Sequence, residues 1–199
     1  MMHLVLHAVR LLGFADTTAI AERFDLQPGP TDEALHDAAA RGWTTRSSFA
    51  GTAGWSLTES GRVENERLLA AELGNARDTV SEVYAEFLPF NALLQRACTD
   101  WQLRPTQSDP LAANDHDDPA WDAGVLHELT AIDGALASIA DRLTDALPRF
   151  EGYNTRFSAA LARATAGDTA WVDRSDVDSC HRVWFELHED LLATLNLKR

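Results

Sequence analysis

The segment from Trp55 to Arg62, WSLTESGR, constrains the fold of this chain more than any other. Trp55 and Leu57 alternate with polar residues, so both side chains face one side of a short strand. Thr58 can then cap a helix, because its hydroxyl can accept a hydrogen bond from a backbone N–H of the first turn. Glu59 favours the positive end of the helix dipole. The segment therefore predicts a strand that ends abruptly at the start of a helix.

A partner for this strand is expected just upstream, in residues 47–54. Gly51 and Gly54 can turn the chain back on itself, because glycine readily adopts backbone conformations that other residues avoid. Residues 43–57 are therefore predicted to form a small antiparallel β-hairpin that runs directly into the helix after Thr58.

Three short helices are predicted before the hairpin. Apolar residues at helical spacing indicate a first helix that ends at Gly13. The second covers residues 19–24 and follows the capping candidates at positions 16–18. Residues 25–30 have the composition of a turn, Thr31 is the predicted cap of the third helix, and Gly42 is its predicted end.

Residues 4–62 resemble the winged helix-turn-helix domain of bacterial transcription regulators of the MarR and PadR type. The resemblance rests on residues 20–26 (IAERFDL), on the segment from Leu35 to Trp43, and on residues 55–62. The last segment is the most specific, since a strand followed by Leu-Thr-x-x-Gly-Arg closes many such wings. The resemblance implies a DNA-binding winged helix domain in residues 1–67. The first seven residues lack the features of a signal peptide and the chain has only two cysteines, so we expect a cytoplasmic protein.

In that family the third helix enters the major groove of double-stranded DNA, and the wing contacts the minor groove or the backbone. The resemblance therefore implies DNA contacts from the third helix, the wing and the start of the next helix. The expected contact residues are Thr31, His36, Arg41, Arg46, Ser47, Ser48 and Arg62.

The charge of the chain argues for a second interpretation. The chain has a formal net charge of −14, and residues 1–67 contain six arginines against nine acidic residues. Phosphate neutralisation supplies much of the affinity for DNA, whereas Asp32, Glu33 and Asp37 in the third helix would repel phosphates. The alternative is a winged-helix protein–protein interaction module whose acidic surface does not bind DNA.

Residues 68–199 are predicted to form a helical domain for dimerisation or effector sensing, so the chain as a whole is expected to be mainly α. An apolar seam with alternating spacings of four and three residues runs from Leu69 to Trp101. The seam is either the interface of a homodimer or the core of a helical bundle. Pro89 predicts a kink or a break near Leu88, since proline removes a helical hydrogen bond.

Further amphipathic helices are predicted after a polar, proline-containing loop at residues 104–119. They cover residues 121–147, residues 153–164, and a last helix for which Ser175 and Asp178 resemble a capping box. Aromatic residues of this domain could line a pocket for a small apolar effector or simply form the core. They are Phe87, Phe90, Trp101, Trp121, Phe150, Tyr153, Phe157, Trp171 and Trp184.

Signals for catalysis, a cofactor, a metal or a membrane are weak in this sequence. His127, Glu128, His181 and His188 could meet only if their helices happened to pack that way, and residues 114–118 lack the glycine and distal glutamate of a calcium loop. Familiar catalytic motifs do not occur, and no apolar run approaches the roughly 20 residues that a membrane helix needs. We therefore expect a protein that is not an enzyme and has no cofactor, no metal site and no membrane span.

Overall fold

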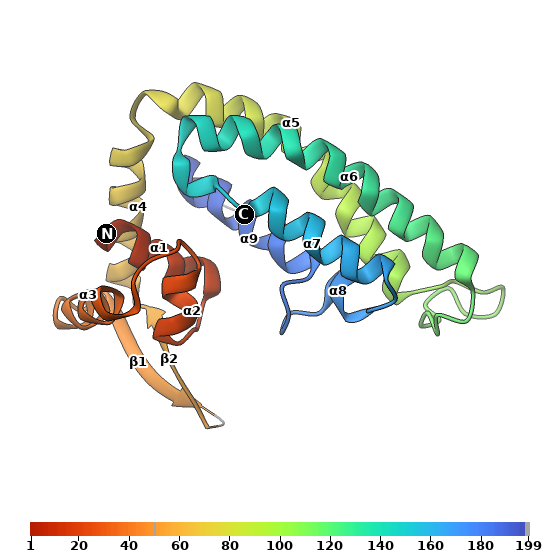
Figure 1. The fold of residues 1–199 in the computed structure, drawn as a ribbon, viewed down its shortest axis with the longest axis horizontal. Helices are drawn as coiled ribbons and strands as arrows, with labels where there is room; N and C mark the ends of the chain where they lie inside the picture. Colours follow the sequence, from red (N-terminus) through yellow and green to blue (C-terminus); the bar gives the residue numbers. More distant parts are fainter. Residues whose placement is uncertain (50, 198–199) are drawn as a thin grey trace. The chain divides into compact units, whose positions relative to one another are not determined.

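A computed structural model of the chain describes residues 1–49 and 51–197 and is mainly helical, with one small antiparallel hairpin among the helices (Figure 1). It divides into two compact units, Met1–Arg77 with Glu189–Arg199, and Asp78–His188. The sequence analysis placed the division after residue 67, but the first unit also takes in the remainder of the helix after the hairpin and the end of the last helix. Across the described residues, no helix is both long enough and apolar enough to span a bilayer.

The first unit contains the hairpin and the helices around it. Its elements are α1 (Met2–Leu12), α2 (Thr17–Glu22), α3 (Pro28–Ala40), β1 (Thr44–Phe49), β2 (Thr52–Leu57), α4 (Glu59–Leu73) and the 3₁₀ turn Gly74–Ala76. The second unit is helical. Its elements are α5 (Arg77–Gln102), α6 (Pro119–Ala146), the 3₁₀ turn Pro148–Phe150, α7 (Tyr153–Thr165), α8 (Ala170–Asp173) and the larger part of α9 (Cys180–Leu195).

The predicted junction between strand and helix is confirmed. The Thr58 hydroxyl accepts a hydrogen bond from the Gly61 N–H at 3.0 Å and donates one to the Gly42 carbonyl at 2.5 Å. A Cβ atom at Gly61 would lie 1.8 Å from the Trp43 carbonyl oxygen. The first turn of α4 therefore contacts the backbone that leads into the hairpin so closely that only glycine fits at this position.

The start of α3 differs from the prediction. Pro28 and Pro30 lie in its first turn, where backbone N–H groups have no intrahelical partner, so their missing N–H groups cost nothing. The helix therefore begins three residues before Thr31, and the cap predicted at Thr31 is wrong. Thr31 is fully buried inside α3.

The end of α3 agrees with the prediction. Gly42 has a positive φ of 75°, and its N–H donates to the Ala39 carbonyl, while the Trp43 N–H donates to the Ala38 carbonyl. This pair of hydrogen bonds is the glycine-terminated cap that satisfies the last carbonyls of a helix. It turns the chain directly from α3 into β1.

The core of the first unit holds the hairpin against the helices. Val5 and Val9 of α1, Ile20 of α2 and Leu35 of α3 form one buried cluster with Trp55 of β2. The segment between α1 and α2 joins the sheet, because Ala15 and Trp55 exchange two backbone hydrogen bonds of 3.2 and 2.8 Å. Trp55 thus connects the hairpin to each of the three helices before it.

The end of α9 packs into the first unit through polar contacts with α1. His7 Nε2 lies 3.0 Å from the Asp190 carboxylate, and both side chains are fully buried. Arg10 forms ion pairs with Glu66 of α4 and Glu189 of α9, each at 3.1 Å. The two ends of the chain are therefore part of one compact unit.

Of the kink or break predicted near Leu88, the break is wrong, because α5 continues through Pro89. An interior proline costs about 3 kcal/mol or more in a helix, but buried side chains hold α5 on both sides of it. They are Val80, Val83, Phe87, Leu94, Ala97 and Trp101. Because the seam is buried within a single chain, it is intramolecular core, one of the two alternatives that its pattern allowed.

The second unit is built around α5, with α6 antiparallel to it (Figure 1). Glu86 pairs with Arg142 and Arg96 with Glu128, so ascending positions on α5 meet descending positions on α6. The helix that follows α8 starts at Cys180, later than predicted, and the Ser179 hydroxyl accepts a hydrogen bond from the Arg182 N–H. The capping pair predicted at Ser175 and Asp178 is therefore wrong.

Candidate nucleic-acid interface

The predicted DNA contacts lie on α3, the hairpin and the start of α4. A network of polar contacts connects α3 and the hairpin to α2. The Trp55 indole N–H donates to the Thr17 hydroxyl at 3.2 Å, and that hydroxyl donates to the Asp32 carboxylate at 3.1 Å. The other carboxylate oxygen of Asp32 lies 3.7 Å from His36 Nε2. The network fixes α2, α3 and the hairpin relative to one another.

His36 and Arg46 come together around the Trp55 ring. The His36 ring meets it edge-on at 5.2 Å between centroids, and the Arg46 guanidinium lies 5.6 Å from its centre. Arg46 and Trp55 are directly paired across the hairpin, so their side chains share one face of it. A residue of α3 and a residue of the hairpin therefore lie beside the same aromatic ring.

Arg41 and Arg62 are close in sequence to the contact between Trp43 and α4. The Arg41 guanidinium lies 5.0 Å from the centre of the Trp43 ring, and Arg62 directly follows the glycine that touches the Trp43 carbonyl. Hydrogen bonds from Arg67 lower the pKa of the nearby Glu64 carboxyl, and Arg41 adds a smaller effect of the same sign. Both arginine side chains are exposed.

Arg41, Arg46 and Arg62 form no ion pair within residues 1–49 and 51–197. Neighbouring cations of the same unit behave differently, since Arg10 pairs with two carboxylates and Arg67 pairs with Glu64. The exposed surface thus presents three guanidinium groups that the rest of the described chain does not neutralise.

The remaining predicted contacts differ in their position. Ser47 and Ser48 are exposed on β1, but successive strand residues face opposite sides, so only Ser48 shares the face of Arg46. Thr31 cannot contact DNA through its side chain, because it is fully buried. The expectation for Thr31 is therefore corrected, since the proline-containing first turn shifts it to the inner face of α3.

The sequence analysis missed the roles of Thr17 and Ala15. Thr17 connects the Trp55 indole to Asp32, and Ala15 extends the sheet by a backbone bridge. Neither contact has a local signal, because each joins residues that are far apart in the sequence. The lone tryptophan in a short amphipathic strand was the one available hint, since a buried indole N–H usually finds a partner.

Five of the aromatic candidates of the second unit are core residues. Phe87, Phe157 and Trp184 stack or meet edge-on in the core of the second unit, and Phe150 and Tyr153 are also buried. In the described part of the chain, no three His, Cys, Asp or Glu side chains are placed to hold a metal ion. In the acidic loop, Asp115 and Asp118 pair with Arg104.

Comparisons of the chain with protein-family models, with curated proteins and with solved structures gave no match. The functional interpretation therefore depends on the geometry described above.

Proposed function

We propose that this chain is a DNA-binding transcription regulator of the winged-helix type that acts as a homodimer. In this proposal α3 enters the major groove, and the hairpin β1–β2 is the wing that contacts the adjacent backbone. A dimer places two such helices in successive major grooves, about 34 Å apart along B-DNA. A small-molecule effector, if it regulates the protein, acts only by binding one dimer spacing more tightly than the other.

The observation that carries the proposal is the set of unpaired arginines around α3 and the hairpin. Arg41, Arg46 and Arg62 are exposed and form no ion pair among the described residues, in a chain with 31 acidic and 17 basic residues. Guanidinium groups bind phosphate oxygens in a bidentate manner. The element order supports the same function, since a helix, a short bridged segment, two helices and a hairpin is the order expected of a winged helix.

One acidic residue of α3 has partners within the first unit. The Asp32 carboxylate accepts a hydrogen bond from Thr17 and lies next to His36, so it has a structural role at the contact between α2 and α3. Glu33 and Asp37 remain exposed. DNA binding is therefore expected to be modest in affinity and sensitive to salt.

The exposed carboxylates of Glu33 and Asp37 favour one other function for the same surface, which is docking of a basic protein partner. In this second candidate the hairpin and α3 form a protein interface rather than a DNA interface. The two candidates differ in a way that can be measured, because only the first requires duplex DNA.

The experiment that tests the proposal is selection of duplex DNA from a random pool by the purified full-length chain at low salt. An enriched palindrome supports a dimeric regulator, and its half-site spacing gives the distance between the two α3 helices. If the chain shows no enriched motif and no salt-dependent binding to generic duplex, the proposal is refuted and docking of a basic protein is favoured.

A further inference from the structure

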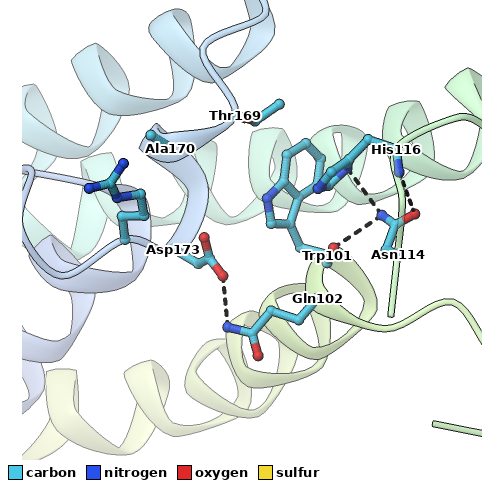
Figure 2. A pocket seen from close by; sticks show the side chains of 8 residues that line it. Trp101, Gln102, Asn114, His116, Thr169, Ala170 and Asp173 are labelled. Atoms are coloured by element: carbon cyan, nitrogen blue, oxygen red, sulfur yellow. Dashed lines mark hydrogen bonds between the residues drawn. The ribbon is translucent and has the colours of Figure 1, made fainter. Parts of the chain in front are cut away.

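A cavity of about 220 Å³ lies in the second unit, where the end of α5, the following loop and α8 meet (Figure 2). Pockets that bind drug-sized molecules measure roughly 300–1,000 Å³, so an occupant of this cavity is smaller. Two walls carry its polar groups. Its lining includes Trp101, Gln102, Asn114, His116, Asp173 and Arg174.

The first wall is held in an unusual backbone conformation. His116 has a φ of 62°, a region that non-glycine residues rarely adopt and that is enriched at binding and catalytic sites. The side-chain oxygen of Asn114 accepts a hydrogen bond from the His116 N–H at 3.2 Å. The centroids of the His116 and Trp101 rings are 4.6 Å apart, and Figure 2 shows the two rings next to each other. The strained residue is therefore fixed by its surroundings.

The hydrogen bonds of this wall determine which His116 nitrogen is available. The Asn114 amide has two hydrogens, which it donates to the Trp101 carbonyl at 3.0 Å and to the Asp122 carboxylate at 2.9 Å. His116 Nδ1 lies 2.9 Å from the second Asp122 oxygen and 3.2 Å from the Asn114 amide nitrogen. Because an ionised carboxylate only accepts hydrogen bonds, we assign a hydrogen to Nδ1, which donates it to Asp122. In the neutral ring, Nε2 is then left as an acceptor.

The opposite wall also offers acceptors. Asp173 accepts one hydrogen bond from the Gln102 amide at 2.7 Å, whereas an ionised carboxylate can accept about four. Arg174 does not neutralise Asp173, because it forms a two-point ion pair with Asp176. Burial raises the pKa of the Cys98 thiol to about 12, and the Asp173 charge adds to that rise.

We propose that this cavity binds a small molecule that carries a protonated amine, with the ammonium group on Asp173. Within the described residues, both amide hydrogens of Asn114 and one of the two of Gln102 are donated, while oxygens of Asp173 and Nε2 of His116 still accept. These acceptors favour a ligand that supplies N–H groups. The surrounding field favours a cation, because residues 78–188 contain eight arginines and nineteen acidic residues. This inference stands independently of the proposed DNA binding.

Isothermal titration of the full-length chain with three molecules of equal length tests the proposal. The probes are 4-aminobutan-1-ol, which is a cation, butane-1,4-diol, which is neutral, and 4-hydroxybutanoate, which is an anion. Saturable binding is expected for the amine alone. Changes in NMR amide shifts on adding the amine are expected at residues 101–102, 114–116 and 169–174, which include the residues that line the cavity.

Two variants that each remove one negative charge are compared, and the second is the control for the first. Asp173→Asn is expected to weaken amine binding by about tenfold or more, since hydrogen bonds to a charged group are among the stronger ones. Asp141→Asn removes one negative charge from an exposed position on α6 and should leave the affinity unchanged.

Several outcomes would overturn the proposal. They are equal binding of the diol, preferential binding of 4-hydroxybutanoate, unchanged affinity in a folded Asp173→Asn variant, and shift changes confined to other parts of the chain. An absence of saturable amine binding would do the same. The comparison of three probes on the wild-type chain decides the question even where the variant does not fold.

Discussion

In the second unit at least seven of the eight arginines pair with a carboxylate, whereas Arg41, Arg46 and Arg62 of the first unit have no such partner among the described residues. Both sets belong to one acidic chain, so overall composition does not explain the difference. Carboxylates are available near the unpaired set as well, since Glu64 lies within the field of Arg41.

The difference separates two uses of a guanidinium group. A paired arginine fixes one helix against another and presents little net charge to a partner, as Arg142 does between α5 and α6. An exposed arginine without an ion-pair partner adds no ion-pair energy to the fold, but its hydrogen-bond donors stay available to a phosphate. We call the paired arginines of the second unit and their carboxylates the paired set, and Arg41, Arg46 and Arg62 the unpaired set. Mutation of the paired set is expected mainly to lower stability, and mutation of the unpaired set mainly to lower DNA affinity.

The strongest test of the paired set is Glu186→Ala. Glu186 is almost fully buried and pairs with both Arg156 and Arg182. Loss of one partner of a buried pair costs about 3–5 kcal/mol, and we expect about 3 kcal/mol because Arg156 keeps Asp178. Denaturant unfolding measures this loss.

The matched control for that variant is Glu82→Ala. Glu82 also pairs with an arginine of the second unit, but its side chain is 72% exposed. Exposed ion pairs contribute about 0–1 kcal/mol, so the midpoint of unfolding should hardly move. Similar losses in the two variants would show that burial of Glu186 has no special importance.

A second test concerns the contact that positions Arg41 and Arg62. In Gly61→Ala the new Cβ would lie 1.8 Å from the Trp43 carbonyl oxygen, so the backbone must shift. Overpacking of this kind costs about 1–3 kcal/mol, and we expect the upper end because the clash is with backbone. Thermal unfolding measures the loss of stability.

Gly134→Ala is the control for the Gly61 variant. A Cβ at Gly134 of α6 meets nothing within 4 Å. Alanine is favoured over glycine inside a helix by about 1 kcal/mol, so this variant should be more stable than the wild type. A neutral effect at Gly61 would mean that α4 does not contact the Trp43 backbone as described.

Local capping and turn chemistry made much of the first unit predictable. The Thr58 cap and the Gly42 helix end depend on neighbouring residues, and both were found as expected. The hairpin was found for the same reason. Because Arg46 belongs to the first strand of the hairpin and Arg62 to the start of α4, the positions of both arginines could be predicted from these features.

The errors arose where long-range packing competes with a local preference. Pro89 predicts a kink or a break, but the buried side chains on both sides of it exclude the break and keep α5 continuous. Pro28 and Pro30 predict a turn, but both fit the first turn of α3, which moves Thr31 into the core. The contact of Thr17 with Asp32 and Trp55 depends on the tertiary fold alone, so no local pattern could predict it.

The unpaired set is tested directly by Arg46→Ala. Each arginine that contacts a phosphate changes the slope of log K against log salt by about 0.9, which corresponds to a loss of about tenfold in affinity at 0.1 M salt. We expect that loss per protomer on both specific and generic duplex, together with a flatter salt dependence. Fluorescence anisotropy over a salt series measures both.

Arg142→Ala is the control for Arg46→Ala, because it also removes one positive charge but from an arginine of the paired set. Its guanidinium is already neutralised by Glu82 and Glu86, so DNA affinity and its salt slope should stay unchanged. If both variants lose the same affinity, the effect is one of total charge, and the hairpin is not the contact surface.

The smallest expected effect comes from Asp37→Asn, which removes an exposed carboxylate from the outer face of α3. If α3 faces the phosphate backbone, this substitution should raise DNA affinity about two- to threefold, since exposed charges act through water and are screened by salt. Asp141→Asn makes the same charge change on α6 and should leave affinity unaltered. An unchanged affinity in both variants would place α3 away from the DNA. A fall in affinity for Asp37→Asn would instead mean that this carboxylate accepts a hydrogen bond from a base, such as cytosine N4, and that the acidic residues of α3 contribute to sequence recognition.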